Sequence, residues 1–385
     1  GTLIRAFWKK ALREMQIKFN DKINQIIKNL ALEAQRFGVK IYFVGGLVRD
    51  VLMGKTPLDI DILVEGNAID FVKSLDFVEI KSIHKDFGTV KTEISGVNID
   101  FASTRIEEYP KSGCLPHVTK IGCDIKDDLI RRDFTINAIA ARILPSLDYE
   151  IIDIFNGCND ISKGVLKVLH KNSYIDDPTR ILRGLDFKLR FNFIFSPEDE
   201  KLIQSYLKNP DREGLSKDRV ILTLNKLFSS NERAMSAISE FSSCCYYKIL
   251  FDEFLFKKEN FENAIKLFDI KDIGRVCLKY ILEAPPVEIK FKSRLEIYKY
   301  FKNFSDVDLC VYYLKTNDKN TLIYFNELKS VVLNIKGLDL LNLGFRQGKI
   351  IGDILDKVLE AKLIKSTNIV TFEDEINFVK ETFKL

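Results

Sequence analysis

The sequence has few of the residues that build metal centres and disulfide frameworks. Its seven cysteines are an odd number with no CxxC spacing, and only three histidines, His84, His117 and His170, lie among them. Structural zinc sites and disulfide scaffolds need a more regular spacing, so neither is expected. Reduced, mostly buried thiols are the remaining interpretation.

Long apolar runs and a strong charge of one sign are also missing. No stretch approaches the roughly 18 apolar residues that span a bilayer, and the first residues lack the layout of a signal peptide. The 59 basic residues nearly balance the 55 acidic ones, and the resulting net charge of +4 permits a nucleic-acid partner without demanding one. We therefore expect a cytoplasmic protein without a membrane segment, and we predict no protein partner.

What is present is a chain of 385 residues, 46% of them hydrophobic, which is too long for one core and too apolar for disorder. Helical periodicity covers residues 3–38 and ends at Gly38, and shorter helical patterns follow over 47–54 and 67–75. From about residue 160 the strand pattern fades and successive helical segments follow. The predicted strands cover residues 40–46, 58–66, 88–96 and 97–103, with the last two forming a hairpin. The sequence predicts a mixed-sheet α/β head followed by a long helical remainder.

Two acids, Asp59 and Asp61, stand one residue apart in the strand predicted over 58–66. Alternate residues of a strand share a face, so both carboxylates would point to one spot while Ile60 and Ile62 enter the core. Adjacent like charges favour a cation between them, and Mg²⁺ prefers a few carboxylate oxygens together with substrate phosphates. The short pattern alone is also compatible with a solvated pair of acids at a strand end.

Residues near this pair suggest what the acids would serve. Gly45 and Gly46 end the preceding predicted strand, where their backbone N–H groups could approach a triphosphate, and Arg49 lies one helical turn later. Asp100, in the strand predicted over 97–103, would complete a carboxylate cluster. Together these residues indicate phosphoryl or nucleotidyl transfer with a pair of Mg²⁺ ions.

Two strings resemble the signatures of one enzyme family. "VGGLVRDVLMGKTPLDIDILVEG" (44–66) is similar to the first signature of the class II tRNA nucleotidyltransferases, the CCA-adding enzymes, and of their bacterial poly(A) polymerase relatives, and "DDLIRRDFTINAIAA" (127–141) resembles the second. The resemblance implies that Asp59 and Asp61 hold the metals and that Asp100 assists the RNA 3′-hydroxyl. It also implies that CTP and ATP are the substrates and that the triphosphate binds at the Gly-Gly turn.

The second signature implies a task for Arg132, Asp133 and Asn137, which would recognise the ribose of the nucleotide. Discriminating a 2′-hydroxyl needs a hydrogen-bond donor and an acceptor placed together, and these residue types supply both. The alternative is an N-capped helix that starts near Asp133.

Further along, "DDPTRILRGLDF" (176–187) resembles the template helix of the family, which implies that Asp177 and Arg180 choose the base and that Arg183 also binds the nucleotide. Their spacing predicts that all three lie along one side of a helix. A carboxylate accepts from the exocyclic amine of cytosine or adenine, whereas uracil and guanine present a carbonyl oxygen there. A surface ion pair between Asp177 and Arg180 is the alternative.

Three other segments match the family less completely. Asp153, Gly157 and Asp160 resemble a connecting element associated with movement between head and neck, and residues 335–364 resemble the tail that holds the tRNA elbow. In that tail Arg346 and Lys349 would contact RNA phosphates, although an ordinary helix-loop-helix explains the string equally well.

Two residues depart from the family pattern. Asp186 stands where an arginine is usual, and Thr223 stands where a glutamate is usual. These departures motivate an alternative in which the chain is a non-catalytic RNA-binding homologue, and the intact carboxylates argue against it.

We therefore predict an α+β fold, with a polymerase-β-like head followed by an elongated all-helical neck, body and tail. The predicted function is template-independent addition of CMP and AMP to the acceptor end of tRNA, with release of pyrophosphate. A CC-adding enzyme, an A-adding enzyme and a poly(A) polymerase are the alternatives, and residues 104–126 are the expected determinant. The expected regions are an N-terminal extension, head, neck, body and tail over residues 1–24, 25–145, 146–232, 233–328 and 329–385.

Overall fold

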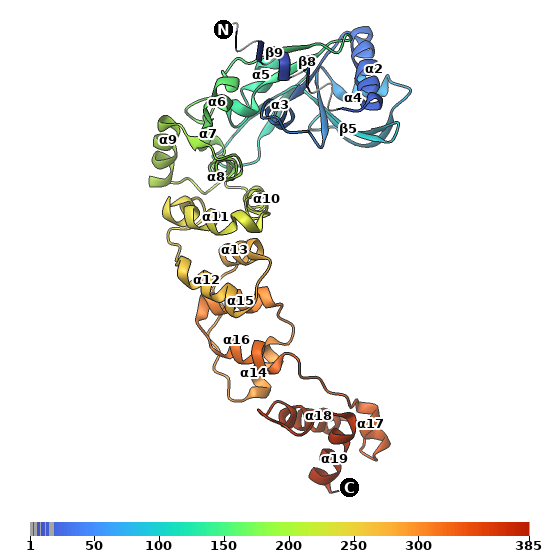
Figure 1. Ribbon diagram of the computed structural model, residues 1–385, viewed down its shortest axis with the longest axis vertical. Coiled ribbons are helices and arrows are strands. Elements are labelled where there is room, and N and C mark those ends of the chain that lie inside the picture. The colour runs from blue at the N-terminus through green and yellow to red at the C-terminus, as the bar shows by residue number, and fades with distance from the viewer. Residues whose placement is uncertain (1–2, 4–5, 8, 12, 15–18, 385) are drawn as a thin grey trace. The chain divides into compact units, whose positions relative to one another are not determined.

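The computed structural model describes residues 3, 6–7, 9–11, 13–14 and 19–384. The chain divides into two compact units (Figure 1). Unit 1 comprises residues 1–227 and 240–254, and unit 2 comprises residues 228–239 and 255–385. The prediction of a helix over the first twenty residues falls partly on residues outside the described ones.

Helix α2 (Asp21–Phe37) opens the fully described part of unit 1. The side chain of Asn20 accepts the backbone N–H of Ile23 at 2.9 Å, which caps the first turn. At the other end, Gly38 adopts a left-handed conformation with φ of +88°, which a glycine tolerates without a steric penalty. The end predicted at Gly38 is therefore confirmed.

The main sheet of unit 1 has seven strands in the order β3-β4-β5-β2-β1-β8-β9. β2 and β5 pair in parallel and the other neighbouring strands pair antiparallel, so the predicted mixed sheet is confirmed. β2 lies in the middle of the sheet. The strands are β1 (Lys40–Val44), β2 (Ile60–Glu65), β3 (Glu79–His84), β4 (Thr89–Ile94), β5 (Val97–Ser103), β8 (Ala140–Ile143) and β9 (Tyr149–Ile152).

The predicted hairpin is formed by β4 and β5. Its turn residues Ser95 and Gly96 both have positive φ, at +50° and +81°, which matches the twist of an antiparallel strand pair. Four of the seven strands of the main sheet follow the predicted runs, whereas β3, β8 and β9 were not predicted. Outside the main sheet lie two further strand pairs, β6 (Arg105–Glu108) with β7 (His117–Ile121), and β10 (Val165–Leu166) with β11 (Ile194–Phe195).

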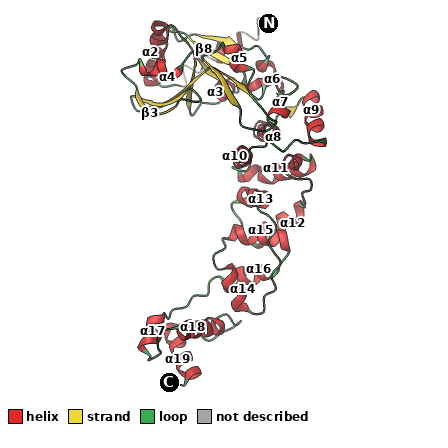
Figure 2. Ribbon diagram, turned by 180° about the vertical axis from the view of Figure 1, so that it is seen from behind, coloured by secondary structure: helices red, strands yellow, loops and turns green. Residues whose placement is uncertain are grey.

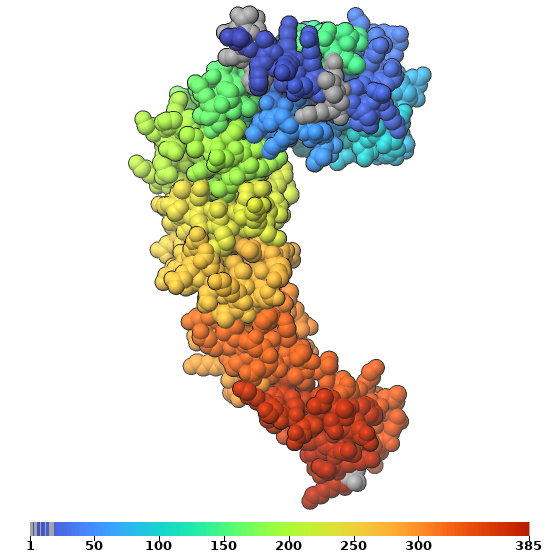
Figure 3. All heavy atoms as spheres, in the orientation of Figure 1, coloured from blue at the N-terminus to red at the C-terminus, as the bar shows by residue number. Residues whose placement is uncertain are grey.

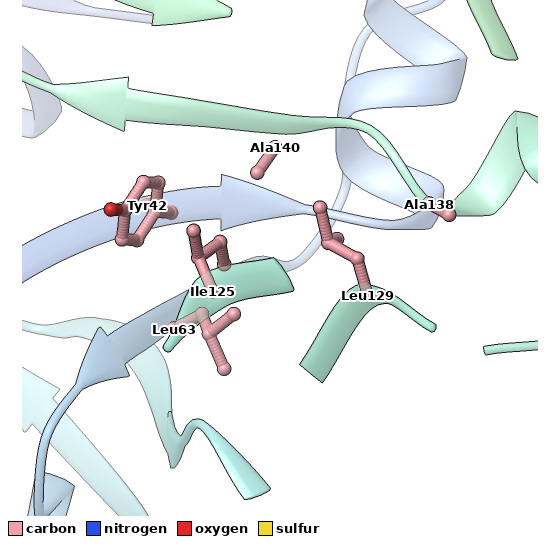
Figure 4. Close-up of a cluster of buried hydrophobic side chains, with 6 residues drawn as sticks. All are labelled: Tyr42, Leu63, Ile125, Leu129, Ala138 and Ala140. Atoms are coloured by element: carbon pink, nitrogen blue, oxygen red, sulfur yellow. The ribbon is translucent and has the colours of Figure 1, made fainter. Parts of the chain in front are cut away.

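A buried cluster fixes the end of the sheet that carries the sequence signatures. Figure 4 shows side chains from β1, β2, β8, the residue Ala138 and helix α5 (Ile125–Leu129) pointing toward one another. This packing brings Gly45, which follows β1, close to Arg132, which follows α5. A Cβ added to Gly45 would lie 3.3 Å from Nη1 of Arg132. The six residues of the cluster are Tyr42, Leu63, Ile125, Leu129, Ala138 and Ala140.

Helices make up most of the rest of unit 1, and strands are confined to this unit in the described residues (Figure 2). Helix α9 shows how one of them begins, because Ser196 caps it by accepting the N–H of Asp199 at 3.0 Å and Pro197 takes its first position. Besides α2 and α5, the described helices of unit 1 are α3 (Gly46–Leu52), α4 (Ala68–Lys73), η1 (Thr135–Asn137), α6 (Gly157–Lys163), α7 (Ser173–Asp176), α8 (Thr179–Phe191), α9 (Pro197–Lys208), α10 (Lys217–Leu227) and η2 (Tyr246–Ile249).

Every regular element in the described part of unit 2 is a helix, and α11 (Asn231–Ser243) contributes residues to both units. The predicted helical remainder is thus confirmed. The helices are α12 (Lys258–Leu267), α13 (Ile273–Leu282), α14 (Arg294–Phe301), α15 (Asp306–Thr316), α16 (Asn320–Ile323), η3 (Tyr324–Leu328), α17 (Gly337–Asn342), α18 (Lys349–Lys362) and α19 (Phe372–Phe383).

The last three helices form one group within unit 2, seen as the red atoms of Figure 3. The buried Glu375 on α19 accepts hydrogen bonds from the backbone N–H groups of Asn334 and Ile335 and forms an ion pair with Lys362 on α18. A buried carboxylate needs such partners, so this network ties α18 and α19 to the segment that precedes α17. Their apolar core consists of Ile335, Leu340, Ile354, Val358 and Val379.

No helix among the described residues is long and apolar enough to cross a membrane.

Candidate active site

The three predicted catalytic acids lie at the middle of the sheet. Asp61 on β2 is the register partner of Asp100 on β5, so the two residues lie side by side on parallel strands. β2 begins at Ile60, so Asp59 immediately precedes the strand rather than lying within it, which corrects the predicted extent of the strand. Burial, together with the charges of Asp100 and Asp59, raises the pKa of Asp61 above its usual value. The like charges therefore do act on one another.

Lys91 on β4 also belongs to this group, although it was not predicted as a site residue. It is the register partner of Asp100 across the β4–β5 pair, and its charge lowers the pKa of Asp61. Asp61, Lys91 and Asp100 line one cavity of about 420 Å³, which Arg105, Arg131 and Arg132 also line. Acids and bases thus share a cavity suited to phosphates.

The described residues contain no group of three or more His, Cys, Asp or Glu side chains that could by itself hold a metal ion. The chemistry of the donors nevertheless fits Mg²⁺, because the mutual repulsion at Asp61 would be relieved by a cation and Mg²⁺ completes its shell with substrate phosphates and water. The carboxylates near Asp61 are hence the residues that would hold the ion.

A larger cavity of about 660 Å³ adjoins this group and shares Gly45, Gly46 and several arginines with it. The structure brings together at this cavity all nine residues that were predicted to bind nucleotide. They are Gly45, Gly46, Arg49, Arg132, Asp133, Asn137, Asp177, Arg180 and Arg183. Side chains up to 138 residues apart in the chain therefore meet around one volume of nucleotide size.

Arg49 is buried at the wall of the larger cavity. Its Nε and Nη2 donate to Oδ1 of Asp50 at 3.0 and 2.8 Å, and its Nη1 donates to Oδ1 of Asn137 at 2.7 Å. The guanidinium also lies over the rings of Phe187 and Phe191, with Cζ 5.2 and 4.8 Å from the ring centroids. These contacts hold the cation in place before any phosphate arrives, although its pKa is lowered by burial.

The second signature forms a compact polar network. Oδ1 of Asp133 accepts from the N–H of Phe134 at 2.7 Å and from Nδ2 of Asn137 at 2.9 Å, while Oδ2 accepts from Nε of Arg183 at 2.7 Å. Burial alone would raise the pKa of Asp133, but the charge of Arg183 and these hydrogen bonds outweigh it and lower the pKa to about 2. The alternative of an α-helix starting near Asp133 is wrong, because only the short 3₁₀ turn η1 follows.

Arg132 is held by a residue that was not singled out from the sequence. Its Nη2 donates to Oδ1 of the fully buried Asp128 at 2.9 Å, and Nε of Arg131 donates to the other oxygen of Asp128 at 3.1 Å. Asp128 stands four residues before Arg132, a helical spacing that could have suggested the pair. Asp128 thus orients both arginines at the junction of the two cavities.

The residues predicted to read the base differ from the prediction in one respect. Helix α8 begins at Thr179, so Arg180 and Arg183 share a helix side, whereas Asp177 precedes the helix in an extended conformation. Asp177 and Arg180 are buried, with 2% and 4% of their surface exposed, and Nε of Arg180 lies 4.0 Å from Oδ2 of Asp177. The alternative of a surface ion pair is therefore wrong, since the pair is buried.

A loop within residues 104–126, the segment expected to determine specificity, and helix α10 complete the larger cavity. The N–H of Gly113 donates to the carbonyl of Asp176 at 3.0 Å, and the carbonyl of Gly113 accepts from Ser216 at 2.8 Å. The residues 109–116 are thus fixed between α7 and the start of α10. On α10, Arg219 forms an ion pair with Asp177. Contacts over such sequence separations leave no trace in local spacing.

Both residues that depart from the family pattern line the larger cavity. The charge of Asp186 contributes to the raised pKa of Arg183, which is due first to Asp133. The hydroxyl of Thr223 donates to the carbonyl of Arg219 at 2.8 Å, one turn earlier in α10. Asp186 thus adds negative charge near Arg183, and the hydroxyl of Thr223 is hydrogen-bonded to the backbone of its own helix.

The predicted connecting element is tied to the second signature. Asp153 accepts the N–H groups of Gly157 and Cys158 at 2.7 and 3.0 Å, and Asp160 accepts from the hydroxyl of Thr135 at 2.6 Å. A Cβ added to Gly157 would lie 2.1 Å from the carbonyl oxygen of Thr135, so only glycine allows this approach.

In unit 2, Arg346 is exposed in the loop between α17 and α18, and the exposed Lys349 is the first residue of α18. Gly344 and Gly348 in the same loop both have positive φ, at +100° and +144°. The segment has the helix-loop-helix form that either interpretation of this region requires, so RNA binding there stays a prediction.

The sequence and the fold were compared with those of known proteins. The model of the poly A polymerase head domain matches residues 41–167. The A-adding tRNA nucleotidyltransferase of Aquifex aeolicus is 44% identical over 168 residues, which are 43% of this chain and 20% of that protein. The solved apo form II of a CCA-adding enzyme is 26% identical, covers 96% of this chain and 98% of its own, and superposes with a TM-score of 0.77. A Thermotoga maritima CCA-adding enzyme complexed with tRNA is 26% identical over 97% of this chain and 98% of its own, with a TM-score of 0.72.

The chain spans less than half of the length of the first curated relatives that it matches, with shares of 20%, 43% and 45%. The solved structures, in contrast, match both units of the chain. Residues 41–167 therefore match a poly A polymerase head domain, and the chain as a whole is similar in fold and sequence to solved CCA-adding enzymes.

Proposed function

We propose that this chain transfers nucleotides from CTP and ATP to the 3′ end of tRNA, without a nucleic-acid template, and releases pyrophosphate. The observation that carries the proposal is the larger cavity, which all nine predicted nucleotide-binding residues line and which adjoins the acids of β2 and β5. A nucleotide whose base lies near Asp177 and whose triphosphate lies near Gly46 and Arg49 would reach toward those acids.

In this proposal the reaction is an in-line displacement at the α-phosphorus. The RNA 3′-hydroxyl oxygen attacks, the bond from the α-phosphorus to the bridging oxygen breaks, and pyrophosphate leaves. Asp100 takes the proton of the attacking hydroxyl, while Arg49 and the N–H groups near Gly46 hold the triphosphate. Asp59 and Asp61 would hold two Mg²⁺ ions, which supply charge neutralisation at the phosphates.

Ribose recognition is assigned to Arg132, Asp133 and Asn137, and base recognition to the corner formed by Asp177 and Arg180. The Asp133 network is already closed by Arg183, which holds these side chains in fixed positions for the ribose. In unit 2, Arg346 and Lys349 are proposed to contact phosphates of the tRNA elbow, while the acceptor stem reaches unit 1. The division into N-terminal extension, head, neck, body and tail is also part of this proposal, and so is a cytoplasmic location.

A second candidate, addition of a single AMP, is favoured by a specific observation. Three relatives of the chain bear the name A-adding tRNA nucleotidyltransferase, and one of them is 44% identical over 168 residues. CC addition and poly(A) synthesis remain further alternatives at the same site.

The experiment that tests the proposal uses transfer RNAs that end before the CCA, after its first C or after its second C. Each is incubated with the full chain, Mg²⁺ and labelled CTP, ATP or both. Growth of every substrate to CCA supports the proposal, whereas extension of only the last one by AMP supports the A-adding candidate. A long A tail on unrelated RNA would favour a polymerase.

The joint replacement of Asp59 and Asp61 by Ala should abolish incorporation. The matched control is Asp76→Asn, which changes an exposed carboxylate between α4 and β3. Undiminished incorporation by the double variant would overturn the assignment of the acids.

A further inference from the structure

The two cavities of unit 1 differ in the residues that line them. The larger one is lined by the nine residues predicted to bind nucleotide, whereas Asp61 and Asp100 line only the smaller one. In the proposed reaction Asp100 takes the proton of the RNA 3′-hydroxyl, so that hydroxyl lies within hydrogen-bond reach of Asp100. The terminal ribose of the RNA therefore belongs in the smaller cavity, whose volume of about 420 Å³ is within the range of ligand sites.

The terminal nucleotide of the RNA brings a negative charge into this cavity. The phosphate on the 5′ side of its ribose is one sugar ring away from the 3′-hydroxyl and is ionised at neutral pH. Asp61 and Asp100 already carry like charges that act on one another, and both would repel the phosphate. A cation beside Asp100 would offset this repulsion.

Lys91 is fixed directly beside Asp100. The two residues are register partners on the antiparallel strands β4 and β5, which places their Cα atoms about 4.5–5.5 Å apart. Register partners point to the same face of a sheet, so the side chain of Lys91 leaves β4 on the face that carries the acids. The start of β4 is anchored as well, because the carbonyl of Gly88 accepts from the N–H and the hydroxyl of Ser103 at 3.0 and 2.8 Å.

The three arginines that line the smaller cavity each donate to an acidic side chain of the protein. The pairs are Arg105 with Glu107 at 2.8 Å, Arg131 with Asp128 at 3.1 Å and Arg132 with Asp128 at 2.9 Å. Lys91 is exposed, and it closes no ion pair among the described residues, although its charge acts on Asp61. Lys91 is hence the cation of this cavity whose ammonium group can turn to a phosphate.

On these grounds we propose that the smaller cavity receives the terminal nucleotide of the RNA, and that Lys91 binds the phosphate on the 5′ side of that nucleotide. The inference rests on the proposed function, because it names where the acceptor end lies at the same site. A phosphate contact positions RNA without reading its sequence, which suits a flexible lysine. The incoming nucleotide lies in the larger cavity and makes no contact with Lys91.

The test measures equilibrium binding of a hairpin RNA to the full chain without nucleotide. The hairpin carries a tRNA acceptor stem that ends in CC. The phosphate on the 5′ side of its last nucleotide is either natural or replaced by a neutral methylphosphonate. The unaltered chain should bind the methylphosphonate RNA on the order of 10-fold more weakly, the lower end for a hydrogen bond to a charged group.

Lys91→Met should bind the natural RNA on the order of 10-fold more weakly and bring the ratio of the two RNA affinities near one. Its affinity for ATP without RNA should stay unchanged, which also shows that the variant is folded. Lys91→Arg keeps the positive charge and should keep a ratio well above one. The matched control is Lys73→Met, at an exposed position of α4, and it should keep the ratio. α4 covers the opposite face of the sheet, where its Phe71 packs against Phe101.

A ratio that persists in Lys91→Met would overturn the inference, as would an unaltered chain that binds the two RNAs equally. An equal loss of affinity for ATP and for RNA in Lys91→Met would also overturn it, because Lys91 would then serve the triphosphate or the acids and not the RNA end. Failure of the proposed function looks different. In that case the chain would incorporate nothing into tRNA, while the dependence of RNA binding on the terminal phosphate and on Lys91 would still be measured.

Discussion

Asp61 and Asp100 face each other across the one parallel strand pair of the main sheet. Antiparallel neighbours flank this pair on both sides, and Lys91 extends the group through β4. The acids are therefore held by the backbone of three adjacent strands, which leaves them little freedom to move apart.

The first prediction concerns stability at this pair. The pKa of Asp61 is raised, so the folded state loses stability as the pH rises from the ordinary pKa of the carboxyl to the raised one. Asp61→Asn should therefore raise the free energy of unfolding at pH 7 by less than about 1 kcal/mol, because solvent screens the charge, and should raise the thermal midpoint accordingly. The difference between the midpoints of the variant and the unaltered chain should vanish near pH 3, and Mg²⁺ should reduce it at pH 7. A lower midpoint for the variant at pH 7 would contradict the charge repulsion.

The second prediction concerns Lys91. Its charge lowers the pKa of Asp61, so Lys91→Met should raise that pKa further. If Asp61 must be ionised to hold the metal, the acid limb of the pH profile of nucleotide incorporation will move to higher pH. The profile of kcat/KM between pH 5 and 8 measures this. Lys28→Met, on the exposed face of α2, should leave the limb in place.

A third prediction follows from the Asp133–Arg183 network. A pKa lowered to about 2 means that this carboxylate contributes stability above the ordinary value of 3.8 and loses it as the pH falls toward 2. Asp133→Asn should cost about 2 kcal/mol at pH 7, from the size of the pKa shift. The gap between the thermal midpoints of the two proteins should begin to close below pH 4. A gap that is independent of pH would point to packing instead of charge.

The fourth prediction concerns the close approach at Gly157. Gly157→Ala places a methyl group against the carbonyl of Thr135, which should destabilise unit 1 by about 1–3 kcal/mol or more. The matched control is Gly352→Ala in α18, where an added Cβ meets nothing within 4 Å and should be neutral or stabilising. Urea unfolding measures the free energy of unfolding of both variants. Equal changes in the two variants would show that Gly157 does not lie tightly against the carbonyl of Thr135.

Much of the head could be predicted from the sequence because its signals are local. Alternation of apolar residues marked β1, β2, β4 and β5, and glycines marked their turns. β7 was missed because it lies half exposed and lacks that alternation, and β3 is exposed along most of its length. In such strands the pairing with a neighbour, and not the residue pattern, decides the structure.

The start of the template helix shows a local signal that was available. Asp177 precedes Pro178, and the residue before a proline is disfavoured in the α-helical region, so the helix could be expected to begin after it. The ion pair of Asp177 with Arg219 is different, since 42 residues separate the partners. Only the packing of α8 against α10 brings them together, and no short pattern encodes that packing.

The place of β2 in the sheet has a consequence for hydrogen exchange. A middle strand opens only when its neighbours open, so the backbone amides of β2 should exchange with solvent deuterium far more slowly than those of the edge strands β3 and β9. Asp61 would then reside in the slowest-exchanging segment of unit 1. A partly unfolded chain that had already lost its outer strands would still keep β2 intact.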